Sequence, residues 1–145
     1  MKIRAFCDKD YPRILEIYAN SKLDELRFEE KTFELLPLDQ DKKRLPPFKE
    51  SDIFVYDDEG VLGYGSVFGS EIRALFVCPS ARGQGVGKAI LEFLLSRIDG
   101  ESNLYIAKTN TPAKMLYEAY GFKVTKEFQT EYNGVHVVVN EMVRP

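Results

Sequence analysis

The strongest chemical signal in the chain is the glycine-rich stretch Arg82-Gly83-Gln84-Gly85-Val86-Gly87-Lys88. It follows an apolar run that indicates a strand and precedes an apolar stripe that indicates a helix. The first N–H groups of a helix lack partners within it and carry the positive end of its dipole, so they attract anions. Glycines let this backbone approach an anion closely, and Arg82 and Lys88 add positive charge. The stretch therefore predicts a phosphate-binding turn.

Two common phosphate motifs do not fit this turn. A Walker A loop that ends at Gly87-Lys88 requires glycine at position 82 and a hydroxyl at position 89, where the chain has Arg82 and Ala89. The dinucleotide fingerprint G-x-G-x-x-G requires glycine at 88 or 90, where the chain has Lys88 and Ile90. The turn is therefore neither a P-loop nor a dinucleotide-binding turn.

The remaining pattern, Arg-x-x-Gly-x-Gly at positions 82, 85 and 87, resembles the acetyl-CoA pyrophosphate loop of the GNAT superfamily of N-acetyltransferases. The run 71–79, which ends in a proline, resembles that family's fourth strand. A downstream segment resembles the family's N-x-x-A…L-Y…G-F pattern, in Asn110, Ala113, Leu116, Tyr117, Gly121 and Phe122. The resemblance is specific from about 52 to 128 and weaker for 1–21 and 129–145. It says nothing definite about 22–51.

The resemblance implies an α/β (α+β) fold: a mixed, mostly antiparallel sheet of six or seven strands, flanked by about four helices. In such a fold strands 4 and 5 splay apart. Acetyl-CoA is then the cosubstrate, with pantetheine in the gap along the backbone of Phe76 and Val77 and near the Asn110 side chain. A local turn bond is the alternative role for Asn110. The pyrophosphate is expected at the turn formed by Arg82, Gly83, Gln84, Gly85, Val86, Gly87 and Lys88.

The implied reaction is direct attack of an amine on a thioester. A backbone N–H, such as that of Val77, would polarise the carbonyl as charge develops on oxygen. Tyr117 matches the family tyrosine that hydrogen-bonds the CoA sulfur and acts as general acid. A phenol with a pKa of about 10 is protonated at neutral pH and can supply a proton to a thiolate with a pKa near 8.5. Alternatively, the ring of Tyr117 completes an apolar helix stripe, and both roles are compatible.

The base that takes the amine proton is expected at Glu71, where some members of the family carry a catalytic glutamate. In a regular strand Glu71 shares a face with Arg73. A solvated glutamate beside Arg73 is an equally good interpretation. A chain of waters could also accept the proton, because some free amine exists at neutral pH.

Other chemically capable residues have plainer explanations. His136 is expected on a hairpin strand in solvent, and Cys78 as a buried structural cysteine. Carboxylates are dense in the segment where this family builds its acceptor site, and these are Asp24, Glu25, Glu29, Glu30 and Glu34. They would suit a cationic amine acceptor, and a solvated helix face explains them equally well.

The elements that position these residues follow from periodicity and turn signals. Asp8 and Asp10 are expected to cap a first helix, and Leu23, Leu26, Phe33 and Leu36 hint at a second. Prolines 37, 46 and 47 predict irregular chain before the next strand. Thr111 is expected to cap the helix that carries Tyr117, and Asn133-Gly134 predicts a hairpin turn. The expected strands are 2–6, 53–56, 61–68, 71–77, 103–107, one beginning at 122, and 135–143.

Composition bounds these interpretations. The 145 residues suit a single domain, 1–145, and 44% hydrophobic content excludes a disordered chain. The net charge of −3 argues against nucleic acid as a partner. No apolar run approaches the length of a membrane span, and the early charges at Lys2 and Arg4 do not suit a signal peptide. Two distant cysteines and one histidine predict neither disulfide nor metal, as in a cytoplasmic protein.

Two classes of function follow. The first is an acetyl-CoA-dependent N-acetyltransferase that acts on a primary amine of a small molecule or protein, as a monomer or homodimer. The second is a non-catalytic module that holds an acyl-CoA as a sensor or partner subunit. Retention of Tyr117 favours the enzyme. Acetylation of charged tRNA is disfavoured by the net negative charge.

Overall fold

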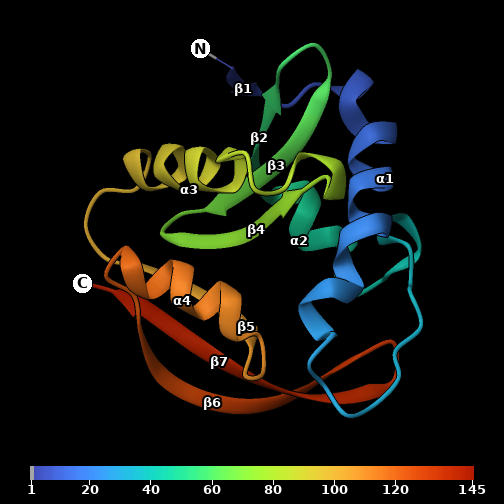
Figure 1. The fold of residues 1–145 in the computed structure, drawn as a ribbon, viewed down its shortest axis with the longest axis vertical. Coiled ribbons are helices and arrows are strands. Elements are labelled where there is room, and N and C mark those ends of the chain that lie inside the picture. The colour runs from blue at the N-terminus through green and yellow to red at the C-terminus, as the bar shows by residue number, and fades with distance from the viewer. Residues whose placement is uncertain (1) are drawn as a thin grey trace.

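The computed structural model describes residues 2–145, which form one seven-stranded sheet flanked by helices (Figure 1). The strand order is β1-β2-β3-β4-β5-β7-β6, and every neighbouring pair is antiparallel except β4 and β5. This confirms the expected mixed, mostly antiparallel sheet. The strands are β1 Ile3–Ala5, β2 Asp52–Asp57, β3 Val61–Phe68, β4 Glu71–Val77, β5 Ser102–Ala107, β6 Lys123–Tyr132 and β7 Val135–Arg144.

In the described part of the chain, four α-helices accompany the sheet: α1 Tyr11–Ser21, α2 Leu45–Glu50, α3 Val86–Ser96 and α4 Thr111–Ala119. Figure 1 shows α3 and α4 in front of the strands. Short 3₁₀ helices connect the elements: η1 Asp8–Asp10, η2 Lys22–Leu26, η3 Leu38–Gln40 and η4 Pro79–Ala81. Within residues 2–145, no helix has both the length and the apolar character that crossing a membrane requires.

Helix α3 packs closely on the sheet because β3 presents glycines to it. A Cβ atom on Gly65 would lie 2.7 Å from Ile90 Cγ2 and 2.8 Å from Leu94 Cδ1. Successive side chains of a strand point to opposite faces, so Tyr64 points away from α3. There its ring contacts Phe48 of α2, with ring centroids 6.3 Å apart. The central strands therefore bury both of their faces.

The segment before β2 differs from the prediction. The helix suggested by Leu23, Leu26, Phe33 and Leu36 does not form beyond η2, and all four side chains instead pack in a second hydrophobic cluster. That cluster includes Tyr132 on the β6–β7 hairpin, so contacts with the hairpin hold this segment in place without a continuous helix. The prolines also do not enforce irregular chain throughout, because Pro46 and Pro47 lie in the first turn of α2. Proline is tolerated there because the first N–H groups of a helix need no partner inside it.

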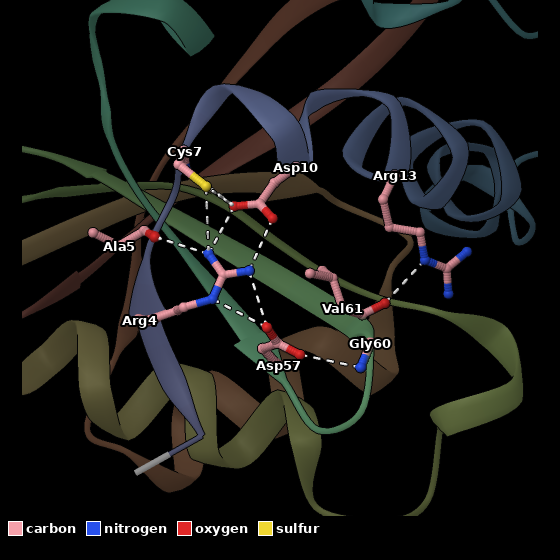
Figure 2. Close-up of polar contacts among 8 residues, drawn as sticks. All are labelled: Arg4, Ala5, Cys7, Asp10, Arg13, Asp57, Gly60 and Val61. Carbon is pink, nitrogen blue, oxygen red and sulfur yellow. Dashed lines mark hydrogen bonds and ion pairs between the residues drawn. The ribbon is translucent and has the colours of Figure 1, made fainter.

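An ion-pair network, rather than the predicted helix caps, holds β1 against the start of α1 (Figure 2). Neither Asp8 nor Asp10 caps α1 with its side chain. The buried Asp10 carboxylate instead accepts hydrogen bonds from Arg4 Nη1 and Nη2 at 2.8 and 2.9 Å, and from the Cys7 N–H at 2.9 Å. Arg4 also pairs with Asp57 at 3.0 Å. The network therefore ties β1 to the start of α1 and to the end of β2.

The predicted hairpin turn between β6 and β7 is confirmed. Asn133 and Gly134 both have positive φ angles, 49° and 81°, as a type I′ turn requires. The two strands pair from Tyr132–Val135 to Lys123–Val143, with a bulge between Val124 and Lys126.

Candidate active site

A cleft opens where β4 and β5 part. The two strands pair only at Glu71 and Asn103 and diverge toward Val77. The cleft has a volume of about 660 Å³ and is lined by β4, β5, α4, η2 and the glycine-rich turn. The predicted splay between strands 4 and 5 is therefore present, and it brings together most of the predicted site residues.

The backbone of β4 offers hydrogen-bonding groups to this cleft. The Cys78 N–H donates to the Leu62 carbonyl at 2.7 Å. Hydrogen-bonded pairs alternate along antiparallel strands, so Phe76 pairs with Tyr64, and the backbone groups of Leu75 and Val77 turn away from β3. Ser21 Oγ of α1 donates to the Val77 carbonyl at 3.2 Å, which agrees with this alternation.

This geometry refines the sequence prediction for Phe76 and Val77. Val77 presents its N–H toward the cleft, and Leu75, which sequence reasoning missed, does the same. The backbone of Phe76 faces β3, while its ring packs against Tyr18 with centroids 5.4 Å apart. Only the register of the β3–β4 pair distinguishes these residues.

The glycine-rich turn has the backbone shape expected of an anion site. Gly83 and Gly85 have φ angles of 78° and 81°, and Gly85 is the N-cap of α3. The N–H groups of Val86, Gly87 and Lys88 lie in the first turn of α3, where no intrahelical carbonyl reaches them.

The residues of the turn lie at different depths. Arg82, Gly83 and Gly87 line the cleft. Gln84, Gly85 and Lys88 are exposed beside it, and Val86 is buried in the core. A Cβ atom on Gly87 would lie 3.4 Å from Val77 Cγ2, so glycine lets α3 approach the end of β4.

Arg82 makes a contact that the sequence did not predict. Its Nη1 lies 2.5 Å from Oδ2 of Asp24, and both side chains are a little over two-fifths exposed. Asp24 belongs to η2, which also lines the cleft. No sequence spacing signals a contact between residues this far apart, although Asp24 was singled out within the acidic stretch.

Asn110 lies at the cleft just before α4. It is 9% exposed and occupies the N-cap of that helix, so Thr111 is the first helical residue rather than the cap. The Asn110 side chain makes no capping hydrogen bond, and its backbone N–H donates to Ala107 at 3.0 Å. The amide is thus not engaged at the helix start and lies among the cleft-lining residues.

Tyr117 on α4 is both a core residue and a cleft residue. It is 8% exposed, and its ring packs edge-to-face on Phe122 with centroids 5.7 Å apart. It also lines the cleft opposite the β4 backbone. Burial, with a smaller contribution from the Glu25 carboxylate, raises the pKa of the Tyr117 hydroxyl above its ordinary value. The hydroxyl is therefore protonated throughout the neutral range.

Two glutamates differ in their relation to the cleft. Glu71 accepts a hydrogen bond from Arg73 Nε at 3.2 Å and is not among the lining residues, although Arg73 is. Arg73 is shared with Glu50, at 2.6 Å. Glu25, on η2, does line the cleft, and Lys22 pairs with it at 2.8 Å. Sequence reasoning noted Glu25 only as one of several acidic residues.

The remaining candidates lie outside the lining of the cleft. His136 is exposed on β7. Cys78 is buried, and a hydrogen bond with Ser80, assisted by Arg13, lowers the pKa of its thiol. Among residues 2–145, no three or more His, Cys, Asp or Glu side chains are grouped as metal binding would need.

Comparison with known proteins identifies the family. Residues 49–124, just over half of the chain, match the family model for the acetyltransferase (GNAT) domain. The peptidyl-lysine N-acetyltransferase YjaB of Salmonella typhimurium is 30% identical over 93 residues, which cover 64% of this chain and 63% of that protein. The match thus spans less than two thirds of this curated relative.

Solved structures share the whole fold at low sequence identity. A GCN5-related N-acetyltransferase from Rhodopseudomonas palustris superposes with a TM-score of 0.78 at 15% identity, over 98% of this chain and 93% of that one. A phosphinothricin acetyltransferase from Sinorhizobium meliloti, solved with acetyl-CoA, has a TM-score of 0.73 at 22% identity, over 100% and 89% of the chains. These structures show that the chain has this fold. The family-model match over more than half of its residues shows that the chain belongs to the GNAT acetyltransferase family.

Proposed function

We propose that this protein transfers an acetyl group from acetyl-CoA to a primary amine, by direct attack while both substrates are bound. The observation that carries the proposal is the cleft itself, which runs from the glycine-rich turn to Tyr117 between strands whose facing edges are unpaired beyond Glu71 and Asn103. One cleft thus holds an anion-binding turn, free backbone donors and a protonated phenol.

Each part of acetyl-CoA has a matching surface in this proposal. The pyrophosphate binds the N–H groups of the turn from Gly83 to Lys88, with Arg82 beside them. The pantetheine arm extends along β4, where the backbone of Leu75 and Val77 supplies peptide-like hydrogen bonds. The Asn110 amide bonds the arm from the α4 side. In this arrangement the phosphates bind at a helix N-terminus, and the pantetheine amides bind at an unpaired strand edge.

The bond changes balance without any further reactant. Before the attack, Glu71 accepts a proton from the bound ammonium through water, because its carboxylate lies outside the cleft lining. The neutral amine attacks the thioester carbonyl carbon, and the Val77 N–H stabilises the negative charge that develops on oxygen. The C–S bond then breaks, and the sulfur takes a proton from the Tyr117 hydroxyl. After the attack, the nitrogen loses its second proton, which returns through water to the Tyr117 oxygen. The products are an acetylated amine and CoA.

The acceptor is proposed to approach as a cation. Asp24 and Glu25 both line the cleft, and their carboxylates favour an ammonium group over an anion. The named activity of the YjaB relative, on peptidyl lysine, makes a lysine side chain the first acceptor to test. A small-molecule amine satisfies the same charge requirement.

The test is a thiol-release assay with acetyl-CoA and a panel of lysine peptides, peptides with free N-termini, polyamines and amino acids. We expect release of CoA that depends on acceptor and enzyme concentration, with acetylation confirmed by mass spectrometry. Tight binding of acetyl-CoA without release across the panel would instead support a non-catalytic acyl-CoA-binding module.

A further inference from the structure

The Asp24–Arg82 ion pair joins two parts of the site that the proposed reaction uses differently. Arg82 precedes the turn proposed to bind the pyrophosphate, and Asp24 lies on η2 at the acidic side of the cleft. The oxygen and nitrogen atoms are 2.5 Å apart, so Asp24 engages Arg82 Nη1, a donor of the kind that binds phosphate oxygens.

We propose that this pair is a latch, in which Asp24 occupies Arg82 in the free protein and acyl-CoA releases Asp24 by offering its phosphates to Arg82. The proposal rests on the proposed function, because it takes acyl-CoA as the ligand of the turn. In this latch the Asp24 carboxylate competes with the phosphates of acyl-CoA for the Arg82 guanidinium.

Arg82 is the cation available for this exchange because the other cleft-lining arginines have different partners. Arg73 is held by Glu50 and Glu71. Arg27 donates to the backbone carbonyl of Asp24 at 2.9 Å and stacks on Phe28. Among the arginines of residues 2–145 that line the cleft, Arg82 is the one next to the glycine-rich turn.

Asp24 stays at the cleft after release because η2 is anchored independently of the ion pair. Leu26 is 6% exposed and packs in the cluster that contains Tyr132 and Val137. The end of α1 is fixed by the hydrogen bond from Ser21 to Val77. Opening the latch is therefore a change of side-chain partner, and it leaves an unneutralised carboxylate where a cationic acceptor would enter.

Because the ion pair and CoA compete for Arg82, the effect of the ion pair can be measured as a change in affinity for CoA alone. Breaking the ion pair opposes CoA binding, so removal of the Asp24 charge should tighten it. An exposed pair of this kind corresponds to a change in affinity of about 1.5- to 5-fold. The change should shrink in high salt, which screens exposed charges.

The experiment is calorimetric titration of CoA into the full-length wild type, Asp24→Asn, Arg82→Gln and the double variant. Asp99→Asn is the matched control, because it removes one exposed negative charge beyond the C-terminal end of α3. We expect tighter CoA binding for Asp24→Asn, weaker binding for Arg82→Gln, and little change for Asp99→Asn. The double variant should bind as Arg82→Gln does, since no arginine remains to be released.

Two results would overturn the latch. Unchanged or weaker CoA binding by Asp24→Asn would show that the pair does not compete with the cosubstrate. Equal tightening by Asp24→Asn with and without Arg82 would show only a general charge effect. Failure of the wild type to bind CoA would remove the proposed function as well, so the two proposals fail in distinguishable ways.

Discussion

Glu71 of β4 lies directly opposite Asn103 of β5, and in the part of the chain from 2 to 145 this is the pair at which the two strands meet. The sheet is continuous through this point, while the rest of the β4 edge remains free to bind a ligand. The site thus depends on a sheet that is joined at one end of two strands and open at the other.

Replacement of Tyr117 by phenylalanine should lower turnover by about 100-fold, because the leaving sulfur loses its proton donor while the ring still fills the core. Affinity for CoA should stay within about twofold, by calorimetry. Tyr120→Phe is the matched control, because its hydroxyl donates to Glu92 at 2.8 Å and is not part of the cleft lining. Equal turnover for Tyr117→Phe and wild type would exclude the acid role.

The pH profile gives a separate test of Tyr117. Burial first, and then Glu25, raises the pKa of its hydroxyl above the ordinary value near 10. The protonated phenol is the active form, so its loss would reduce the rate only above that raised pKa. The rate of CoA release, measured at a series of pH values, should therefore not decline between pH 8 and pH 10. A decline centred near pH 8.5 that is absent in Tyr117→Phe would contradict this.

Replacement of Glu71 by glutamine should lower kcat/KM about tenfold at pH 7, because the ammonium loses a base. The defect should vanish as the pH approaches the amine's own pKa, near 10.4 for lysine, since the free amine then needs no base. Glu50→Gln removes the other carboxylate that binds Arg73 and serves as the control for effects transmitted through that arginine. If Glu71→Gln lowered kcat/KM by the same factor at every pH, Glu71 would have a structural role instead.

Replacement of Tyr132 by phenylalanine should loosen the segment before η3 from the β6–β7 hairpin. The Tyr132 hydroxyl accepts from the Leu36 N–H at 2.8 Å and donates to the Leu36 carbonyl at 3.2 Å. Its loss leaves both backbone groups without this partner in a buried setting, at a cost of about 1–3 kcal/mol in the free energy of unfolding. Urea denaturation should show this cost, whereas Tyr105→Phe, at a half-exposed ring, should show almost none.

Replacement of Asp10 by asparagine should make stability less dependent on pH. Hydrogen bonds from Arg4, aided by the Cys7 backbone, hold the pKa of Asp10 well below its ordinary value. The unfolded chain therefore binds the proton more readily, and the stabilisation is complete above about pH 5 and declines as pH falls below about 4. The deficit of Asp10→Asn should be about 1–3 kcal/mol at pH 7 and smaller at pH 3.

Urea denaturation at the two pH values measures this deficit. Asp8→Asn, an exposed carboxylate in the same 3₁₀ helix, is the control and should change stability little at either pH. A deficit for Asp10→Asn that is as large at pH 3 as at pH 7 would show that the ion pair is not its source.

The sequence alone predicts elements whose signals are local. The hairpin at Asn133-Gly134 follows from two residues that tolerate positive φ, and α3 follows from an apolar stripe behind a glycine turn. The glycine-rich pattern led to Arg82, Gly83 and Gly87, and the resemblance to the acetyltransferase family led to Asn110 and Tyr117. All five line the cleft. The local patterns failed at Leu23, Leu26, Phe33 and Leu36, because apolar spacing cannot distinguish a helix from a segment held by a distant hairpin.

The sequence by itself thus determined the glycine-rich turn and the order of strands and helices along the chain. Through the family resemblance, it also pointed to Tyr117 as the candidate acid. Tertiary structure decided which β4 backbone groups face the cleft, because the alternation of hydrogen bonds depends on the register with β3. It also decided the partners of charges: Arg82 meets Asp24, and Glu71 meets Arg73. Register and charge pairing arise between segments distant in sequence, whereas turn and helix signals arise within a few residues.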